Sequence, residues 1–345
     1  MEFSLSLSFF VFLLSTNLIG SEAARLRFGK DGQFKILQVA DMHYAKGSRT
    51  PCEDVLQIQY STCSDLNTTA FLNRMIRAEN PDLIVFTGDN IFGSDTTNPE
   101  KSLNAAFAPA IESKIAWAAV LGNHDQESTL SREGLMKHIV KMKYTESQVN
   151  PAEARDIDGF GNYNVEVGGV EGSKVANKSI LNLYFLDSGD YSKNQSISFY
   201  DWIKLSQQKW FRKTSLRLKN KYGKGPRSSP GLAYFHIPLP EYADFDSKNF
   251  TGVKGENAIS SASVNSGFFS TMVKAGDVKA VFTGHDHLND FCGKLTGINL
   301  SRVVLATLEK TEENGWGAVK NITTWKRLDD EHLTTIDPQI LWTKP

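Results

Sequence analysis

The chain has 345 residues, of which 40% are hydrophobic and 22% are charged, and its formal net charge is -1. This length and composition are typical of a globular protein with a substantial core, in one large domain or in one domain with a small annex. A net charge near zero, without a basic run, argues against nucleic acid or another polyanion as a partner held by bulk electrostatics. The composition leaves the oligomeric state open.

The first residues of the chain form an apolar segment unlike the rest. Phe3 to Ile19 is apolar with interspersed serines, and the tripeptide from Ser21 to Ala23 offers small residues to a signal peptidase. We therefore predict a signal peptide over residues 1–23 and a secreted, extracellular protein. The alternative is an uncleaved membrane anchor, which Thr16 and Asn17 disfavour because they interrupt the apolar span.

Short apolar runs then alternate with stretches of helical periodicity. The apolar runs carry aromatic and β-branched residues, as buried strands do, and they are Phe34 to Ala40, Leu83 to Thr87, Trp117 to Leu121, Leu232 to Phe235 and Val278 to Phe282. The expected helices are Thr69 to Ala78, Ser102 to Ser113 and Ser206 to Lys219, and the expected exposed loop is Lys219 to Pro230. Strands that alternate with helices predict an α/β fold.

Residues with metal-binding side chains follow each expected strand. The blocks are Asp41-Met42-His43, Gly88-Asp89-Asn90, Gly122-Asn123-His124-Asp125, Tyr234-Phe235-His236 and Gly284-His285-Asp286-His287. In α/β sheets ligands collect at the carboxyl ends of strands, so we expect these blocks to converge. Imidazole and oxygen ligands without thiolates suit zinc, manganese or iron.

The number of candidate ligands indicates how many ions the site holds. The seven candidates are Asp41, His43, Asp89, Asn123, His236, His285 and His287. Seven ligands are too many for one tetrahedral ion but suit two ions that share a carboxylate, an arrangement that favours phosphoester hydrolysis.

Each block also has a simpler explanation. His285 and His287 are turn histidines in that view, held by backbone hydrogen bonds. Asp89 and Asn123 cap helices, and His236 is a core residue. Five blocks in sequence, each after an expected strand, favour the metal site.

These blocks resemble the motif series of the calcineurin-like metallophosphoesterases, which is D-x-H, G-D, G-N-H-D/E, H and G-H-x-H. The flanking sequence is similar to the plant purple acid phosphatases whose members are often called probably inactive. The resemblance implies a four-layer α/β/β/α sandwich with two mixed β-sheets, which we expect over residues 24–345. It also implies that the first metal is held by Asp41, His43, Asp89 and His287, and the second by Asp89, Asn123, His236 and His285.

The resemblance further implies a reaction on a small phosphorylated substrate. A hydroxide between the two ions would attack a phosphomonoester in line, while His124 protonates the leaving group and Asp125 orients His124. One alternative is a homologue that keeps the metal shell and binds phosphate or a partner without turnover. Another is a phosphodiesterase or nucleotide hydrolase, because the shared core does not fix the substrate class.

Two departures from the family pattern stand out. Purple members carry a metal-binding tyrosine three residues after the bridging aspartate, whereas this chain has Phe92, and His43 supplies a ligand that they lack. Relatives also have a Gly- and aromatic-rich stretch after Leu300, whereas this chain continues directly with Ser301. The second departure suggests an internal deletion at 300/301 and an altered fold beside His287.

The cysteines and glycosylation motifs bear on secretion. Cys52 and Cys63 are close enough in sequence to close a disulfide loop, which would leave Cys292 without a cysteine to pair with. The alternative is that Cys52 and Cys63 are free thiols. The expected N-glycosylation sites are Asn67, Asn177, Asn194, Asn249 and Asn321. A sixth motif, at Asn299, is attributed to the shortened join.

Overall fold

The computed structural model describes residues 26–345, except 53, 56, 153–155, 195, 198, 223–228, 246–249, 301–303 and 311–314. The predicted signal peptide over residues 1–23, the glycosylation site at Asn249 and one side of the 300/301 join lie outside the described residues. Within the described part of the chain, none of the helices has the length and apolar character that spanning a membrane requires.

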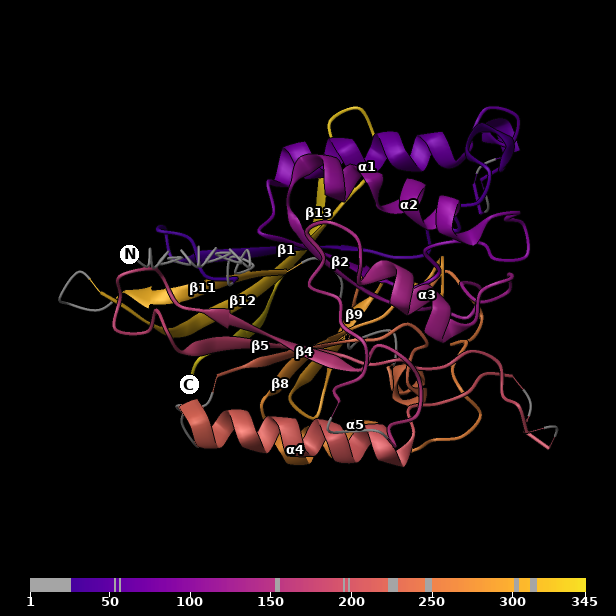
Figure 1. Cartoon of the computed structure of the whole chain (residues 1–345). Helices are drawn as coiled ribbons and strands as arrows, with labels where there is room; N and C mark the ends of the chain where they lie inside the picture. The colour runs from indigo at the N-terminus through magenta and orange to yellow at the C-terminus, as the bar shows by residue number, and fades with distance from the viewer. Residues whose placement is uncertain are drawn as a thin grey trace, which may run out of the picture.

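Two mixed β-sheets lie against each other at the centre of the molecule (Figure 1). The six-stranded sheet has the order β13 (Thr335–Thr343), β12 (Trp316–Arg327), β11 (Val304–Lys310), β1 (Gln33–Val39), β2 (Leu83–Thr87) and β3 (Ala116–Val120). The seven-stranded sheet has the order β4 (Tyr163–Gly168), β5 (Ser179–Phe185), β6 (Gly231–Tyr234), β8 (Val278–Phe282), β10 (Ile298–Leu300), β9 (Cys292–Leu295) and β7 (Phe250–Thr251).

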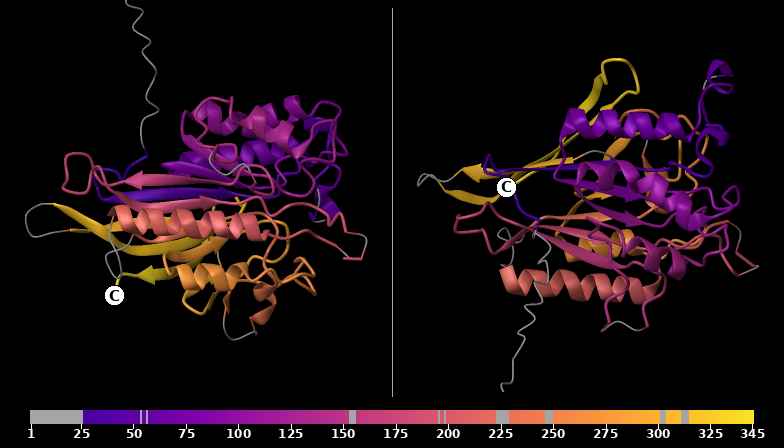
Figure 2. Two further views of the ribbon diagram at one scale, coloured as in Figure 1. Left: turned by 60° about the horizontal axis from the view of Figure 1, so that its bottom comes forward. Right: turned by 45° about the horizontal axis from the view of Figure 1, so that its top comes forward.

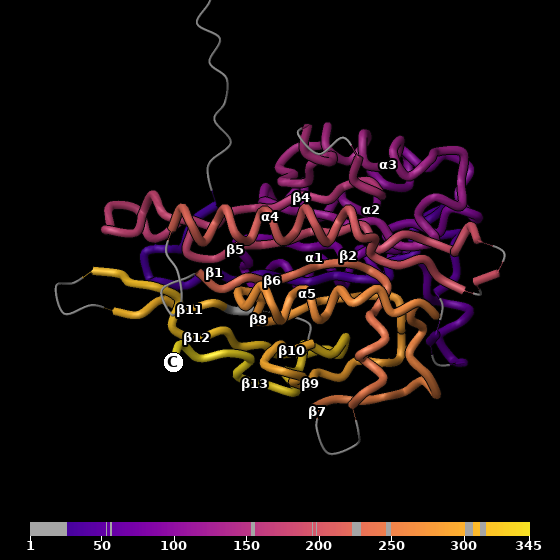
Figure 3. The backbone as a smooth tube through the Cα atoms, turned by 90° about the horizontal axis from the view of Figure 1, so that it is seen from below, coloured from indigo at the N-terminus to yellow at the C-terminus, as the bar shows by residue number. Residues whose placement is uncertain are grey.

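Helices cover the outer face of each sheet (Figures 1 and 2). Those on the first sheet are α1 (Asp65–Glu79), α2 (Pro99–Ser113) and α3 (Arg132–Ile139), and those on the second are α4 (Leu205–Tyr222) and α5 (Phe268–Ala275). The view from below shows α4 and α5 side by side across the second sheet (Figure 3). Short 3-10 turns are η1 (Gly47–Arg49), η2 (Gln57–Gln59) and η4 (Pro240–Asp244). The four-layer α/β/β/α prediction is confirmed.

The core explains why these segments become strands. Side chains from the facing surfaces of both sheets, including Phe34, Val85, Leu183, Tyr234 and Phe282, form one buried cluster between them. Because helices cover the other faces, β2 is buried at every residue, which accounts for its continuous apolar run. Parallel pairing of β1 with β2 and of β2 with β3 then places the loops after these strands at one edge.

The structure confirms the predicted elements and adds to them. All five expected strands and all three expected helices are present, with small differences at their ends. Helix α4 continues to Tyr222, so the expectation of a loop beginning at Lys219 is wrong for its first residues. The helices and strands not predicted are α3, α5, β4, β5, β7 and β9 to β13, and the 3-10 turns were not predicted either.

The cysteine pairing is confirmed, and the glycosylation motifs differ in exposure. Cys52 and Cys63 form a disulfide, and Cys292 is free and buried. Asn67, Asn177 and Asn194 are exposed, whereas Asn321 is half-buried on β12. The amide of Asn299 is buried and donates to the carbonyls of Lys279 and Leu341, so this sixth motif is inaccessible.

Candidate metal centre

The loops that follow five parallel strands meet at one end of the sandwich. They follow β1, β2 and β3 of the first sheet and β6 and β8 of the second. Backbone hydrogen bonds join the first two loops, from Asp41 N to Gly88 O at 3.1 Å and from His43 N to Asp89 O at 2.9 Å. The loops from the two sheets are also joined, because the Asp41 carboxylate accepts from His285 N at 2.8 Å. Residues that lie more than two hundred positions apart in sequence thereby share one site.

The backbone of these loops is unusual. Asp41, His43, Asp89 and His285 have positive φ angles of 53°, 46°, 47° and 80°. A non-glycine residue in this region costs of order 1 kcal/mol or more, and such residues cluster at functional sites. These left-handed residues lie directly after β1, β2 and β8, where the chain leaves the sheet at the candidate centre.

The seven predicted ligands form two groups around Asp89. In the first group, His43 Nε2 lies 3.1 Å from His287 Nε2, and His287 Nε2 lies 3.9 Å from Asp41 Oδ1. In the second, His236 Nε2 lies 3.2 Å from Asp89 Oδ2 and 3.1 Å from Asn123 Oδ1. His285 offers a nitrogen within 4.8 Å of the ligand atoms of Asp89 and His236. Asp89 Oδ2 is also 3.7 Å from His43 Nε2, so this carboxylate lies between the groups.

Burial controls the protonation of the candidate ligands. Burial lowers the pKa of His43 to about 4 and the pKa of His285 to about 3, so both imidazoles are neutral at neutral pH. Burial also acts to lower the pKa of His236, but the charge of Asp89 raises it to about 9. Burial acts to raise the pKa of Asp89, yet the charge of His236 outweighs it and holds that pKa below its ordinary value. The metal-free centre therefore presents two neutral imidazoles, His43 and His285, and a protonated His236 beside the ionised Asp89. Metal binding would release the His236 proton, because a ligating imidazole is neutral.

The site fits metal ions on two further observations. His285 Nε2 is buried and has no hydrogen-bond partner in the described part of the chain, which is costly unless something else satisfies it. Two nitrogens that each bind an ion at about 2.1 Å lie about 3 to 3.4 Å apart, and the 3.1 Å between His43 Nε2 and His287 Nε2 falls in that range.

Comparisons with known proteins agree with this geometry. The sequence profile of the calcineurin-like phosphoesterases matches residues 34–289, which contain every candidate ligand. The chain belongs to this family.

Individual relatives are similar over nearly the whole chain. "Probable inactive purple acid phosphatase 29" of Arabidopsis thaliana is 56% identical, over 99% of this chain and 94% of the relative. "Probable inactive purple acid phosphatase 14" of the same plant is 52% identical, over 93% of this chain and 86% of the relative. The first alignment spans 364 positions, more than the 345 residues of this chain, so that relative has residues without a counterpart here.

A solved structure supports the fold. "GAP50 the anchor in the inner membrane complex of Plasmodium" superposes with a TM-score of 0.50 over 91% of this chain and 90% of that one. The two sequences are 12% identical, so the likeness concerns the fold alone.

The predicted partner of His124 differs from the one in the structure. His124 Nδ1 lies 2.8 Å from Glu127 Oε2, whereas the Asp125 carboxylate accepts from Gly122 N at 2.7 Å and from Ile91 N at 3.0 Å. Burial, and then the charge of Asp89, raise the pKa of Asp125 to about 6. The structure thus has Asp125 joining the loops after β2 and β3, and Glu127 holding the His124 ring.

Phe92 lies beside the centre in this member of the phosphoesterase family. Its ring centroid is 5.3 Å from that of His43 and 4.8 Å from that of His124. Tyr44, the nearest tyrosine in sequence to the first block, is buried and its hydroxyl faces Thr69 at 3.4 Å. The position that holds a tyrosine phenolate in purple members therefore presents an apolar ring to the centre in this chain.

Several further residues complete the site and were not predicted from the sequence. Asp54 contacts His287, Tyr191 accepts from the Asn123 amide at 3.2 Å, and Tyr200 packs on His285 with ring centroids 4.4 Å apart. Glu127 lies three residues after His124, a spacing that brings side chains together in a turn. This spacing is the sequence signal that could have predicted the contact between Glu127 and His124. Tyr191 and Tyr200 stack with centroids 5.5 Å apart, in the segment between β5 and α4.

A cavity of about 380 Å³ opens beside the first group of ligands. Its walls include Asp41, His43 and His287, the Cys52–Cys63 disulfide and Phe71 of α1. The cavity is large enough for a small organic group attached to a phosphate.

Proposed function

We propose that this phosphoesterase-family chain is a secreted, dinuclear metal-dependent hydrolase of phosphomonoesters. The observation that carries the proposal is the convergence of the seven candidate ligands, with Asp89 Oδ2 3.7 Å from His43 Nε2 of the first group and 3.2 Å from His236 Nε2 of the second. Two bound ions, of zinc, manganese or iron, would supply Lewis-acid charge neutralisation and an activated water for in-line displacement. Asp89 would stabilise both ions at once, because a shared carboxylate reduces their mutual repulsion.

His124 is the residue we assign to the leaving group. Its Nδ1 is engaged by Glu127, which leaves Nε2 as the nitrogen that can donate a proton. Its backbone N–H donates to Asp89 Oδ1 at 2.8 Å, so the ring is held beside the bridging carboxylate. A positioned histidine of this kind contributes general acid catalysis to the departure of an alkoxide.

A rival function is a homologue without turnover, which keeps the metal shell and binds phosphate or a partner. The names of the similar Arabidopsis relatives, both "Probable inactive purple acid phosphatase", favour it. The absence of a phenolate at Phe92 is weaker support, because His43 provides a ligand in its place.

Metal-dependent hydrolysis separates these functions. The protein, loaded separately with zinc, manganese or iron, is assayed with nitrophenyl phosphate and with bis-nitrophenyl phosphate, and metal-stripped protein is the control. We expect hydrolysis of the monoester that is lost on stripping and restored by metal. Two bound metals without hydrolysis would favour the rival, and faster hydrolysis of the diester would reassign the substrate class. The same assays on a version with the relatives' residues inserted at 300/301 test whether the join limits activity.

Secretion rests on separate support. The predicted signal peptide ends at residue 23, Cys52 and Cys63 form a disulfide, and the motifs at Asn67, Asn177 and Asn194 are exposed. We expect the protein expressed in a secretory host to begin at Ala24 and to lose mass when N-glycans are removed. Retention of Met1 in an unglycosylated intracellular product would contradict secretion.

A further inference from the structure

The rings of two candidate ligands are held in different ways. His236 Nδ1 lies 2.9 Å from the carbonyl of Thr87, the last residue of the buried strand β2, and the His236 side chain is fully buried. His287 Nδ1 contacts the carboxylate of Asp54, whose side chain is 48% exposed. The orientation of His236 therefore depends on the sheet, whereas that of His287 depends on a side chain in a loop.

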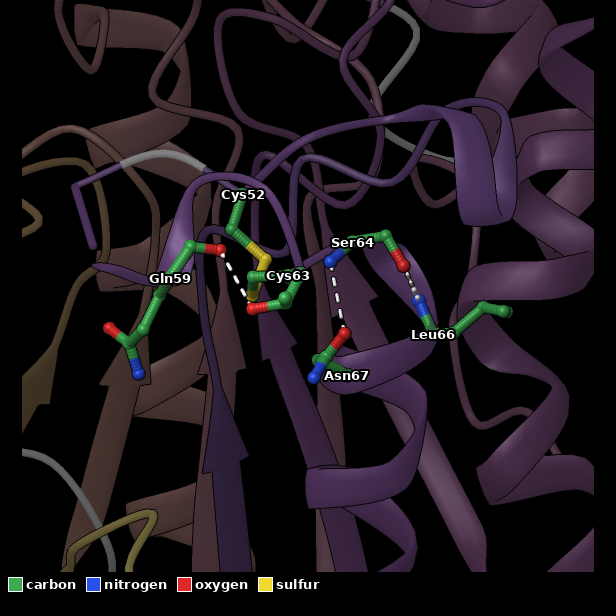
Figure 4. Close-up of a disulfide and its surroundings, with 7 residues drawn as sticks. Cys52, Gln59, Cys63, Ser64, Leu66 and Asn67 are labelled. Atoms are coloured by element: carbon green, nitrogen blue, oxygen red, sulfur yellow. Dashed lines mark hydrogen bonds between the residues drawn. A yellow bond between two sulfur atoms is a disulfide. The ribbon is translucent and has the colours of Figure 1, made fainter. Parts of the chain in front are cut away.

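The loop that carries Asp54 is fastened to helix α1 by a disulfide. Asp54 follows Cys52 by two residues, and Cys52 is bonded to Cys63, with 5.4 Å between their Cα atoms. Cys52 N also donates to Cys63 O at 3.4 Å. Ser64, the next residue, is the N-cap of α1 and takes part in a capping box with Asn67. Figure 4 shows the disulfide between the turn at Gln59 and this helix start.

The start of α1 is in turn bonded to the segment that follows the first ligand block. The Asp65 carboxylate accepts from Ala45 N at 3.0 Å and from Gly47 N at 2.7 Å. The disulfide thus connects the Asp54 loop to the part of the chain that also carries Asp41 and His43. Asp54, with a φ of 49°, is held in a strained conformation within this assembly.

The position of the proton on the His287 ring explains why its contact with Asp54 matters. An imidazole that gives its Nε2 lone pair to a metal carries its proton on Nδ1, and a carboxylate that accepts this proton fixes both the tautomer and the direction of the ring. Removing such a partner lowers metal affinity by about 10- to 100-fold. In the second group the corresponding partner is a backbone carbonyl, which a side-chain substitution leaves in place.

We propose that Asp54 is a positioning residue for His287, that the Cys52–Cys63 disulfide holds Asp54 in place, and that the pair sets the affinity of the first of the two metals. This inference rests on the dinuclear centre of the proposed function. It assigns the disulfide a role at the metal centre in addition to its constraint on the chain.

Zinc titration of matched variants tests the proposal. The variants are Asp54→Ala, Asp54→Asn and the double variant Cys52→Ala/Cys63→Ala. The control is Glu100→Ala, which removes an exposed carboxylate 3.8 Å from His138, a histidine outside the centre. The two dissociation constants of each protein are measured by competition with a chelator, and near-UV circular dichroism checks the fold.

We expect Asp54→Ala to weaken one zinc by about 10- to 100-fold and to leave the other within a few-fold of the parent. Asp54→Asn should recover part of the loss, because an amide oxygen still accepts from Nδ1–H. The double cysteine variant should weaken the same zinc, and Glu100→Ala should change neither. In nitrogen NMR of the zinc-loaded protein, Asp54→Ala should alter the His287 ring signals and leave those of His236 unchanged.

The possible results distinguish a failure of this proposal from a failure of the proposed function. A parent that binds fewer than two zinc ions contradicts the dinuclear centre itself. A parent that binds two, with Asp54→Ala indistinguishable from Glu100→Ala, overturns the role of Asp54 while the dinuclear centre stands. Weakening in Asp54→Ala without weakening in the folded cysteine variant overturns the role of the disulfide.

Discussion

The Arg132–Asp187 ion pair is the interaction whose removal should most clearly damage the loop that carries Asn123. Arg132 is 8% exposed and Asp187 is 2% exposed. The guanidinium contacts both oxygens of the Asp187 carboxylate and donates to Gly122 O at 2.6 Å and to Leu121 O at 3.2 Å. Arg132 therefore holds the two carbonyls that directly precede Asn123.

The cost of removing this arginine follows from burial. Arg132→Leu leaves a buried carboxylate without its cation and two carbonyls without their donor, and breaking a buried pair typically costs about 3 to 5 kcal/mol. For 345 residues the entropy of unfolding at the midpoint is about 0.7 kcal/mol/K, so Tm should fall by about 4 to 7 °C. The Asn123 loop should loosen as well, which weakens the second metal.

Thermal unfolding in the presence of a chelator measures the cost without a contribution from bound metal. The matched control is Arg217→Leu, because Arg217 is half-exposed and its guanidinium lies 3.5 Å from Glu166. An exposed pair of this kind contributes about 0 to 1 kcal/mol. If Arg132→Leu lowers Tm by no more than Arg217→Leu does, the buried pair contributes no more stability than an exposed one, and the expected cost is refuted.

Three further predictions address the leaving group, the metal spectrum and the C-terminal strands. His124→Ala should keep both metals and slow hydrolysis of an alkyl phosphate by about 10² to 10⁴, but that of nitrophenyl phosphate only slightly, and equal losses on both would remove the acid role. Ferric-iron-loaded protein should lack a strong visible band and Phe92→Tyr should gain one, whereas a strong band in the parent would show that another tyrosine binds the metal. Burial acts to raise the pKa of Glu79, but hydrogen bonds from Trp325 and Arg327 outweigh it and hold that pKa below its ordinary value of 4.5. The ionised Glu79 stabilises the fold fully above the unfolded pKa, and this contribution is lost as the pH falls through the lower folded pKa. Glu79→Gln should therefore cost about 1 to 2 kcal/mol at pH 7, and urea titrations should show this cost shrinking below about pH 4.5. A cost independent of pH would refute the role of the charge.

Burial determines how much of the fold could be predicted from the sequence. β2 and β3 were predictable because helices and the second sheet cover both of their faces, which makes them continuous apolar runs. β12 mixes buried residues with half-buried Lys326 and Arg327, so its sequence, rich in Thr and Lys, resembles a surface loop. Helices α3 and α5 have only eight residues each, too few for a clear helical period.

The ligands of the candidate site were predictable because they directly follow expected strands. The residues that hold those ligands in place were not. The ligands follow strands in short blocks, so a count of blocks anticipates their convergence. Asp54 lies 233 positions from His287, and no local pattern connects them. Asp125 follows His124 directly, but its carboxylate turns back to the amides of Gly122 and Ile91. Only the turn geometry, in which Glu127 N donates to His124 O at 3.2 Å, brings the carboxylate of Glu127 to the ring.

The metal content of the parent protein and of Asp89→Ala shows whether two ions share the Asp89 carboxylate. Asp89 lies between the two groups of ligands, so removing its charge should weaken both ions together. Elemental analysis after equilibration with limiting free zinc should give two metals per chain in the parent and fewer than one in Asp89→Ala. One metal per chain in the parent, or two retained in the variant, would contradict a dinuclear centre bridged by Asp89.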